Sequence, residues 1–281
     1  MEKMNVQTID TIEGRLLGFE PPEAFRCPHC GREMSVFGVL VGGKPYWRRQ
    51  SPAMCECDGN KAEQRRIRQE EREREFFLKE KERKAEAAKH TQAADRGSRF
   101  KARTFDAFIA DTDNIDAYGS AKALADNFGE YRAMSGRNGL WLVGGMGTGK
   151  THLAVAIVNG IDSRFSALYM TEQEMYQRAK ELMTTDDNFE FYTLLKTVSL
   201  LILDDVGKEK PGEWGVSLLF DIINARYEHS LPTVITSNYG GDSLTKRLTV
   251  GDNRTTAAAL VDRLFEMCEV RVLQGKSRRR R

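Results

Sequence analysis

The sequence predicts an α/β fold with a parallel sheet flanked by helices, preceded by a small cysteine-rich domain and a charged helical linker. Three observations predict this organisation. After residue 104 apolar strand-like runs alternate with helical stretches, four cysteines crowd the first fifth of the chain, and residues 61–90 contain neither glycine nor proline. Alternation of strands with helices is typical of parallel sheets that are covered by helices.

The composition limits the class of protein. The chain has 281 residues, enough for one mid-sized domain with an appendage. Hydrophobic residues make up 40% and charged residues 30%, and this excludes a wholly disordered chain. No stretch approaches the roughly 18 apolar residues of a membrane helix, and the N-terminus lacks the apolar run of a signal peptide. We therefore expect a cytoplasmic protein that has no membrane partner.

The first 60 residues indicate a metal-binding domain. Cys27 and Cys30 form a CxxC pair, and Cys55 and Cys57 form a CxC pair. Two close pairs of thiolates suit a tetrahedral Zn²⁺ ion, and in a reducing compartment they favour a metal site over disulfides. His29, inside the CxxC pair, is an alternative ligand. Redox chemistry is a rival interpretation that the absence of a surrounding βαβ pattern weakens.

Between the two cysteine pairs, residues 34–41 and 44–47 predict a β-hairpin around Gly42 and Gly43. A ribbon this small buries too little area to fold unaided, so zinc would supply its stability. Four sulfur ligands leave no open position, and this indicates a structural role. The remaining thiol, Cys268, is most simply a small buried apolar residue.

A charged segment follows the cysteines. Residues 61–90 are dominated by Glu, Arg and Lys, with opposite charges four positions apart, as at Glu70 and Arg74. These residues favour a solvated connecting helix. Residues 91–103 indicate a flexible hinge. The predicted domains are therefore a zinc ribbon at 1–60, a charged helical linker at 61–103 and the α/β domain at 104–281.

The α/β domain begins with a nucleotide-binding signature. Strand-like runs are predicted at 140–143, 167–170, 199–203 and 233–236, with helices at 152–161, 172–182 and 216–228. The first run leads into Gly144, Gly145, Met146, Gly147, Thr148, Gly149, Lys150, Thr151 and His152. In this phosphate-loop pattern the glycines let backbone N–H groups converge on phosphates, and the following helix N-terminus adds positive potential. Lys150 can reach the β- and γ-phosphates of ATP, and the Thr151 hydroxyl can hold Mg²⁺.

Two further strand ends complete the expected site. The run at 199–203 ends in Asp204 and Asp205. Asp204 would bind the Mg²⁺ shell, and Asp205 would polarise the attacking water. Many related ATPases have Glu at the second position, whose side chain is longer. The run at 233–236 leads to Asn238, which is either a γ-phosphate-sensing side chain or an ordinary turn residue.

Taken in order, these motifs resemble the AAA+ domain of DnaC/DnaI-type replicative helicase loaders. The resemblance covers most of residues 104–281 and includes TFDAF from 104, GGMGTGKTHLA from 144, LLILDDVG from 200, RY at 226, LPTVITSN from 231, VDRL from 261 and GKSR from 275. The phosphate loop and the acidic strand are common to many ATPases. The ordered set is more specific.

The resemblance implies roles for further residues. Asn238 would match the first sensor, and Arg263 the arginine finger that enters a neighbouring subunit's site, so that hydrolysis needs a self-oligomer. Arg278 would match the second sensor, with Arg279 as an alternative because the chain ends in four arginines. Arg226 would lie at the subunit interface or, more simply, in a salt bridge.

The resemblance also implies a function. The zinc domain would bind the replicative hexameric helicase, and the ATPase domain would use ATP and Mg²⁺ to load it onto single-stranded DNA in replication initiation. Two alternatives stay open: an IstB-like transposition helper ATPase, in which a zinc ribbon is not expected, and a nucleotide-dependent helicase adaptor or inhibitor with little turnover. Basic residues such as Lys246, Arg247 and Arg254 either contact DNA or are solvated.

Overall fold

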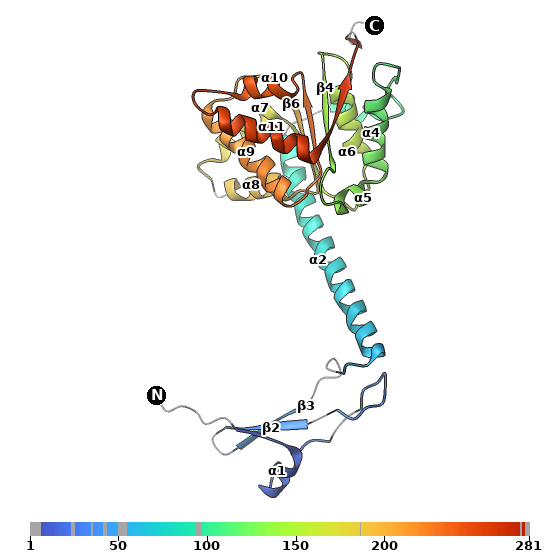
Figure 1. The fold of residues 1–281 in the computed structure, drawn as a ribbon, viewed down its shortest axis with the longest axis vertical. Coiled ribbons are helices and arrows are strands. Elements are labelled where there is room, and N and C mark those ends of the chain that lie inside the picture. The colour runs from blue at the N-terminus through green and yellow to red at the C-terminus, as the bar shows by residue number, and fades with distance from the viewer. Residues whose placement is uncertain are drawn as a thin grey trace. The chain divides into compact units, whose positions relative to one another are not determined.

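The fold is described by a computed structural model that covers residues 7–23, 26–34, 36–41, 44–49, 55–93, 97–185, 187–275 and 277–278. The chain divides into two compact units, Met1–Phe76 and Phe77–Arg281 (Figure 1). The division falls inside a helix and differs from the domain boundaries predicted after residues 60 and 103. Within the described residues, no helix combines the length and apolar character of a membrane span.

The first unit contains a three-stranded antiparallel sheet. Its order is β1 (Gln7–Ile9), β2 (Val36–Val41) and β3 (Lys44–Arg49). Strands β2 and β3 confirm the predicted hairpin, with Val41 opposite Lys44; its two glycines lie outside the described residues. Strand β1 was not predicted, because three residues are too few to show an alternating pattern.

A short helix connects β1 to the rest of this unit. Helix α1 (Thr11–Leu16) begins after Asp10, whose carboxylate accepts the backbone N–H groups of Ile12 and Glu13, each at 2.8 Å. Glu13 in turn accepts the Asp10 N–H, which completes a capping box. Gly14 packs against the Trp47 ring, where a Cβ would lie 2.2 Å from a ring carbon. This contact joins α1 to β3.

Helix α2 (Asp58–Ala93) confirms the predicted charged helix. Apart from the buried Asn60, its first turns are mostly exposed and carry surface ion pairs, such as those of Arg66 with Glu63 and Glu70. The expectation of a solvated helix is wrong for the C-terminal half, where Glu80, Ala87 and His90 are buried. The spacing of these residues places them on one face of the helix, and that face packs within the second unit.

Glu80 anchors this half of α2 to the sheet. Its carboxylate accepts the Ser166 N–H at 2.5 Å and the Ser199 hydroxyl at 3.0 Å, just before strands β5 and β6 begin. Although burial acts to raise the pKa of Glu80, the pairing with Arg83 and the contacts with Ser166 hold it below its ordinary value. Ten residues further on, the His90 ring packs 4.6 Å from that of Phe191.

The segment predicted as a hinge contains helical residues. Helix α2 continues to Ala93, and Gly97–Lys101 form the short helix α3. The Phe100 ring meets the Tyr169 ring edge-on at 5.0 Å and packs against the core. Burial of this aromatic ring explains why the segment is a helix rather than a free hinge.

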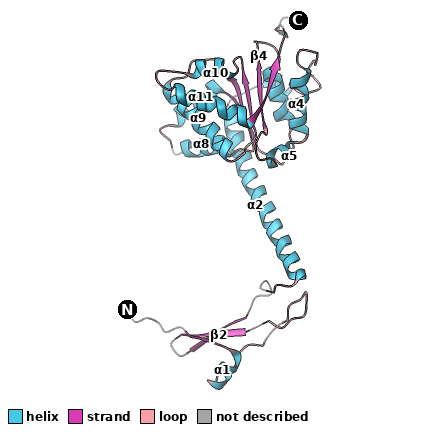
Figure 2. Cartoon of the chain, in the orientation of Figure 1, coloured by secondary structure: helices cyan, strands magenta, loops and turns pink. Residues whose placement is uncertain are grey.

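The second unit is built on a five-stranded parallel sheet, shown in magenta between helices in Figure 2. The strands in spatial order are β5 (Ala167–Thr171), β6 (Leu200–Val206), β7 (Thr233–Ser237), β4 (Gly139–Gly144) and β8 (Cys268–Leu273). Four of them confirm the strand-like runs. The edge strand β8 was not predicted, because Glu269 and Arg271 interrupt its apolar residues. Cys268 is buried there, as expected.

Helices cover both faces of this sheet (Figure 1). One face holds α4 (Ile115–Asp126), α5 (Phe128–Ala133) and α6 (Lys150–Gly160). The other holds α7 (Glu172–Leu182), α8 (Asp187–Thr197), α9 (Glu213–Glu228), α10 (Gly241–Leu248) and α11 (Arg254–Met267). Strand residues alternate between the two cores: Leu140 and Leu142 pack with α6, and Trp141 packs 5.2 Å from Phe265 on the opposite face.

Arg226 does not form the salt bridge that the sequence favoured. Its guanidinium is fully buried beneath α9 and donates hydrogen bonds to four oxygens at 2.7–3.1 Å: the backbone carbonyls of Leu195, Val198 and Pro232 and the hydroxyl of Thr233. Burial lowers its pKa to about 9. Two of the carbonyls lie at the C-terminal end of α8, where the helix dipole favours a cation. Arg226 therefore joins α9 to the end of α8 and to the residues at the start of β7, and it is not exposed for a contact with another subunit.

Candidate nucleotide and metal sites

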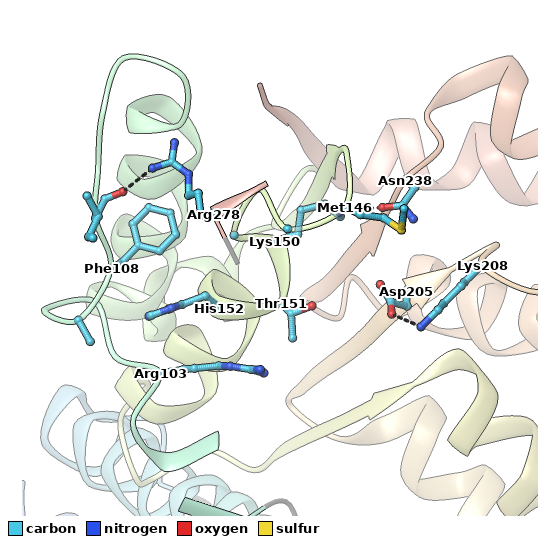
Figure 3. A pocket seen from close by; sticks show the side chains of 14 residues that line it. Arg103, Phe108, Met146, Lys150, Thr151, His152, Asp205, Lys208, Asn238 and Arg278 are labelled. Carbon is cyan, nitrogen blue, oxygen red and sulfur yellow. Dashed lines mark hydrogen bonds and ion pairs between the residues drawn. The ribbon is translucent and has the colours of Figure 1, made fainter. Parts of the chain in front are cut away.

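A cavity of about 320 Å³ lies at the carboxyl ends of β4, β6 and β7 (Figure 3). Parallel α/β sheets bind ligands at this edge. The labelled side chains around it are those of Arg103, Phe108, Met146, Lys150, Thr151, His152, Asp205, Lys208, Asn238 and Arg278. The structure thus brings together residues from four predicted motifs, and adds side chains from the segment before β4.

The phosphate loop joins β4 to α6. Gly147 and Gly149 have φ values of +78° and +113°, which residues with side chains rarely adopt. A Cβ on Gly149 would also lie 2.8 Å from the Phe108 ring. Helix α6 has no side-chain cap at its N-terminus, so its first N–H groups are available for an anion. His152 Nε2 donates a hydrogen bond to the Thr104 carbonyl oxygen at 2.8 Å and so joins α6 to the segment before β4.

Lys150 is held inside the loop. Its Nζ lies 2.8 Å from the carbonyl oxygens of Gly144 and Gly145 and 2.9 Å from Asn238 Oδ1. The side chain is buried, so its positive charge is concentrated at the cavity wall. The contact places Asn238 beside the loop, where the sequence prediction required a sensor. An ammonium group held by neutral oxygens can exchange these contacts for phosphate oxygens.

Asp204 lies at the centre of a hydrogen-bond network. Its carboxylate is buried and accepts the Thr151 hydroxyl at 3.1 Å, the Tyr169 hydroxyl at 2.5 Å and the Thr236 hydroxyl. Carboxylate and hydroxyl oxygens are the ligands that Mg²⁺ prefers. Thr151 and Asp204 are therefore adjacent and chemically suited to hold Mg²⁺, with nucleotide phosphates as further ligands.

Asp205 points into the same cavity from an unusual backbone conformation. Its φ is +61°, one of two positive values among the described residues other than glycine. Its carboxylate accepts from Lys208 Nζ at 3.0 Å, and its N–H donates to Thr236 Oγ1 at 2.9 Å. Figure 3 shows the ion pair between Asp205 and Lys208 at the cavity wall.

The two arginines with expected roles lie in different places. Arg278 lines the cavity, and its N–H donates to the Gly147 carbonyl at 3.0 Å, but its guanidinium binds Asp111 at 2.7 Å. Arg279 lies outside the described residues. Arg263 does not line the cavity; on α11, it binds Asn224 Oδ1 at 2.6 Å and packs over the Phe220 ring.

A second cavity, of about 720 Å³, adjoins the first and shares Asp205 and Lys208 with it. Glu172 lies on its wall and is buried, where it accepts the Gly207 N–H and the Tyr176 hydroxyl, both at 2.9 Å. Burial raises the pKa of Glu172 to about 7. This carboxyl group therefore gains a proton more readily in the folded chain than in the unfolded one.

Replacing this carboxyl group should change how stability depends on pH. The pKa of Glu172 is higher in the folded state, so its ionisation destabilises the fold as pH rises through 4.5 to about 7. We expect Glu172→Gln to gain stability relative to the original protein, by up to about 3 kcal/mol, between about pH 5 and about pH 8. Urea unfolding at both pH values measures this gain. Glu130→Gln, at an exposed position, should show none, and an equal gain in both variants would contradict the assignment.

The four clustered cysteines form a candidate zinc centre in the first unit. The sulfur atoms of Cys27, Cys30, Cys55 and Cys57 lie within 4.8 Å of one another. Two of the separations are 3.8 Å, for Cys27 and Cys57, and 3.5 Å, for Cys30 and Cys55. Four sulfurs around a tetrahedral zinc ion would lie about 3.8 Å apart. The sulfur positions therefore fit a Zn²⁺ ion.

Backbone N–H groups donate to two sulfur atoms of the cluster, those of Cys27 and Cys57. N–H groups of His29 and Cys30 point at the Cys27 sulfur and lower its pKa to about 6. The Asn60 N–H donates to Cys57 Sγ at 3.4 Å. His29 itself is not among the clustered ligands, because its side chain lies against Gly59, where a Cβ would approach it to 2.8 Å.

Several residues of the nucleotide site had no predicted role. Tyr169 and Lys208 contact the two aspartates but belong to no recognised motif. Thr236, which contacts both aspartates, lies in the LPTVITSN stretch, where only Asn238 was given a role. Phe108 belongs to the TFDAF stretch, which supported the family resemblance but was given no role in the site.

Of the basic residues proposed for DNA, Arg247 donates to the carbonyls of Gly207 and Lys208 at 2.8 and 2.6 Å, and so holds the loop after β6.

Comparisons with known proteins relate the chain to replication ATPases. The family described as IstB-like ATP binding protein matches residues 61–281. The replicative helicase loader DnaI of Bacillus subtilis is 26% identical over 162 residues, 56% of this chain and 52% of DnaI. The chromosomal replication initiator protein DnaA of Nautilia profundicola is 34% identical over 114 residues, 39% of this chain and 25% of DnaA. The chain thus spans about half the length of DnaI and a quarter of the length of DnaA.

Solved structures show the same relationship. A crystal structure of the DnaC helicase loader matches 63% of this chain and 100% of its own, with 26% identity and a TM-score of 0.53. A crystal structure of DnaI matches 63% of this chain and 90% of its own, with 25% identity and a TM-score of 0.51. These likenesses confirm the predicted AAA+ P-loop fold.

Proposed function

The chain belongs to the family of IstB-like ATP-binding proteins, and we propose that it acts as an ATP-dependent loader of a replicative hexameric helicase. The observation that carries the proposal is the presence, on one chain, of a loader-like ATPase unit and a separate unit with four clustered cysteines. The unit with the four cysteines, Met1–Phe76, would bind the helicase. The ATPase unit, Phe77–Arg281, would bind ATP and single-stranded DNA, so that ATP binding and hydrolysis drive loading.

The residues of the cavity suit ATP hydrolysis. The phosphate loop and Lys150 bind the phosphates through N–H groups and one buried cation. Mg²⁺, held by Thr151 and Asp204, would neutralise charge on the β- and γ-phosphates. Asp205 orients the attacking water, for which its carboxylate must leave Lys208. Asn238, beside Lys150, senses the γ-phosphate.

Two arginines complete the proposed site. Arg278 reaches the γ-phosphate after release from Asp111, to which it is bound in this structure. Arg263 does not line the cavity of its own chain, and we assign it to the cavity of a neighbouring subunit. In that case its contacts with Asn224 and Phe220 fix the position of its side chain on α11. Hydrolysis then depends on the assembly of several chains through their ATPase units.

A second candidate is an IstB-like transposition helper, which the family match favours. It shares the ATPase unit but gives no role to the four clustered cysteines. A third is an adaptor that inhibits a helicase and turns over little ATP. The Lys208–Asp205 ion pair favours slow turnover until the aspartate is released.

Light scattering after size exclusion tests the proposal. The protein is mixed with the replicative helicase of its source in ATP and Mg²⁺, and we expect a discrete complex that transfers the helicase to circular single-stranded DNA. The Cys30→Ser variant should lose the complex, while Cys268→Ala, a buried thiol of the second unit, should retain it. Separate elution under every nucleotide condition would contradict a loader. A complex without transfer would favour the adaptor, and binding of a transposase instead would favour the helper.

A further inference from the structure

The pairing of strands β6 and β7 is irregular where the two aspartates lie. Leu203 lies opposite Ile235, and Val206 lies opposite Ser237. Asp204 and Asp205 on β6 therefore face a single residue, Thr236, on β7. An extra residue on one strand is a β-bulge, which bends that strand and redirects its side chains.

The Thr236 hydroxyl takes the place of the missing backbone pairing. It accepts the Asp205 N–H at 2.9 Å and donates its own proton to Asp204 Oδ1. Thr236 is fully buried and does not line the nucleotide cavity. One hydroxyl group is thus bonded to both acidic residues from a position outside the cavity lining.

This contact also holds an unfavourable backbone conformation. Asp205 has a φ of +61°, a left-handed conformation that costs free energy for a residue with a side chain. The conformation separates the directions of the two carboxylates. Asp204 points inward to Thr151 and Tyr169, and Asp205 points into the cavity toward Lys208. Loss of the Thr236 oxygen would leave the Asp205 N–H without its acceptor and would remove one of the two hydroxyl groups that donate to Asp204 Oδ1.

We propose that Thr236 is a positioning residue for the magnesium-dependent step, because its hydroxyl fixes the bulge that aims Asp204 and Asp205. The inference rests on the proposed ATPase function and adds a residue to that site. A purely structural hydroxyl offers a comparison on the same strand. Ser237 Oγ donates to the Val206 carbonyl at 2.6 Å, which joins the same two strands without contacting either carboxylate.

The test measures the response to Mg²⁺ separately from nucleotide binding. The variants are Thr236→Val, which removes the hydroxyl at nearly constant volume, Thr236→Ala, which removes it without adding a methyl group in its place, and Thr236→Ser, which keeps it. Ser237→Ala is the matched control. The readouts are the affinity for a fluorescent ATP analogue in EDTA, the Mg²⁺ concentration that gives half-maximal ATPase activity, kcat, and the thermal midpoint.

We expect Thr236→Val and Thr236→Ala to raise the half-maximal Mg²⁺ concentration and to lower kcat, each by about tenfold. Affinity for the analogue in EDTA should stay within about twofold, and Thr236→Ser should restore both magnesium-dependent values. Ser237→Ala should lower the thermal midpoint while the half-maximal Mg²⁺ concentration stays unchanged.

Three results would overturn the proposal. One is a normal Mg²⁺ response in Thr236→Val and Thr236→Ala, and another is an equal shift in Ser237→Ala. The third is failure of both hydroxyl-free variants to fold, which would make Thr236 a structural requirement. If the original protein binds the analogue with no response to Mg²⁺, the proposed ATPase function falls as well. If the original protein responds to Mg²⁺ and Thr236→Val responds in the same way, only the role of Thr236 is contradicted.

Discussion

Replacing Lys150 with methionine should abolish ATP hydrolysis and weaken ATP binding, with losses of about 100- to 1000-fold in kcat. Lys150 is a buried cation at the cavity wall, where its Nζ contacts three neutral oxygens at 2.8–2.9 Å. Methionine keeps the unbranched apolar stem, so the variant removes the charge with little change in packing. The charge is the feature that phosphate oxygens would meet. Malachite-green release of phosphate and titration with a fluorescent ATP analogue measure the two effects.

A surface lysine provides the matched control for this variant. Lys122 on α4 pairs with Asp126 at 2.9 Å in an exposed position, away from the cavity. Lys122→Met removes the same charge from the same unit and should hydrolyse ATP at the original rate. A Lys150→Met protein that keeps its thermal midpoint and hydrolyses ATP normally would contradict the assignment of this cavity to ATP.

Removing zinc should unfold the first unit while the ATPase unit stays intact. Among the described residues of the first unit, the apolar cluster around the cysteines is small: its buried members are Cys27, Met34 and Cys55. Structural zinc sites contribute about 10–16 kcal/mol to the folding of small domains. We expect one zinc ion per chain by metal analysis. After chelation under denaturant-free conditions, we expect rapid proteolysis of residues 1–57 and an unchanged thermal midpoint for the second unit.

Two cysteine variants separate metal binding from general loss of a thiol. Cys55→Ser removes one ligand of the cluster and should lose both the zinc and the protease resistance of the first unit. Cys268→Ala removes a buried thiol on β8 and should retain both. A first unit that resists protease with no bound metal would show that the cluster folds without zinc, and the assignment would fail.

Local patterns predicted the parts of the fold that are encoded in contiguous residues. Strands β4, β5, β6 and β7 are apolar runs that are buried on both faces, so their composition alone marks them. Strand β8 borders the sheet and alternates apolar with charged residues, and its position became clear only from its pairing with β4. Helix α2 was predicted as a helix, but the burial of Glu80 depends on Ser166 and Ser199, which lie 86 and 119 residues away.

The candidate site divides in the same way. The phosphate loop and the two aspartates are short motifs whose chemistry lies within a few residues, and the sequence was sufficient to place them. Thr236 and Tyr169 contact Asp204 from neighbouring strands, so their roles follow from register and not from spacing. Arg226 shows the opposite error. An arginine suggests an acidic partner, but backbone carbonyls at the end of α8 satisfy this one.

The contact of Glu80 with the sheet limits where the chain can be cut or exchanged. A fragment that begins at residue 104 would lack the carboxylate that binds the Ser166 N–H and the Ser199 hydroxyl, as well as the apolar contribution of Ala87 to the core. Chimeras that graft another recognition module onto this ATPase should therefore join the two sequences in the exposed turns of α2 before Phe77. The boundary between the two compact units lies within the helix, after Phe76, whereas the charged segment of the sequence continues to residue 90.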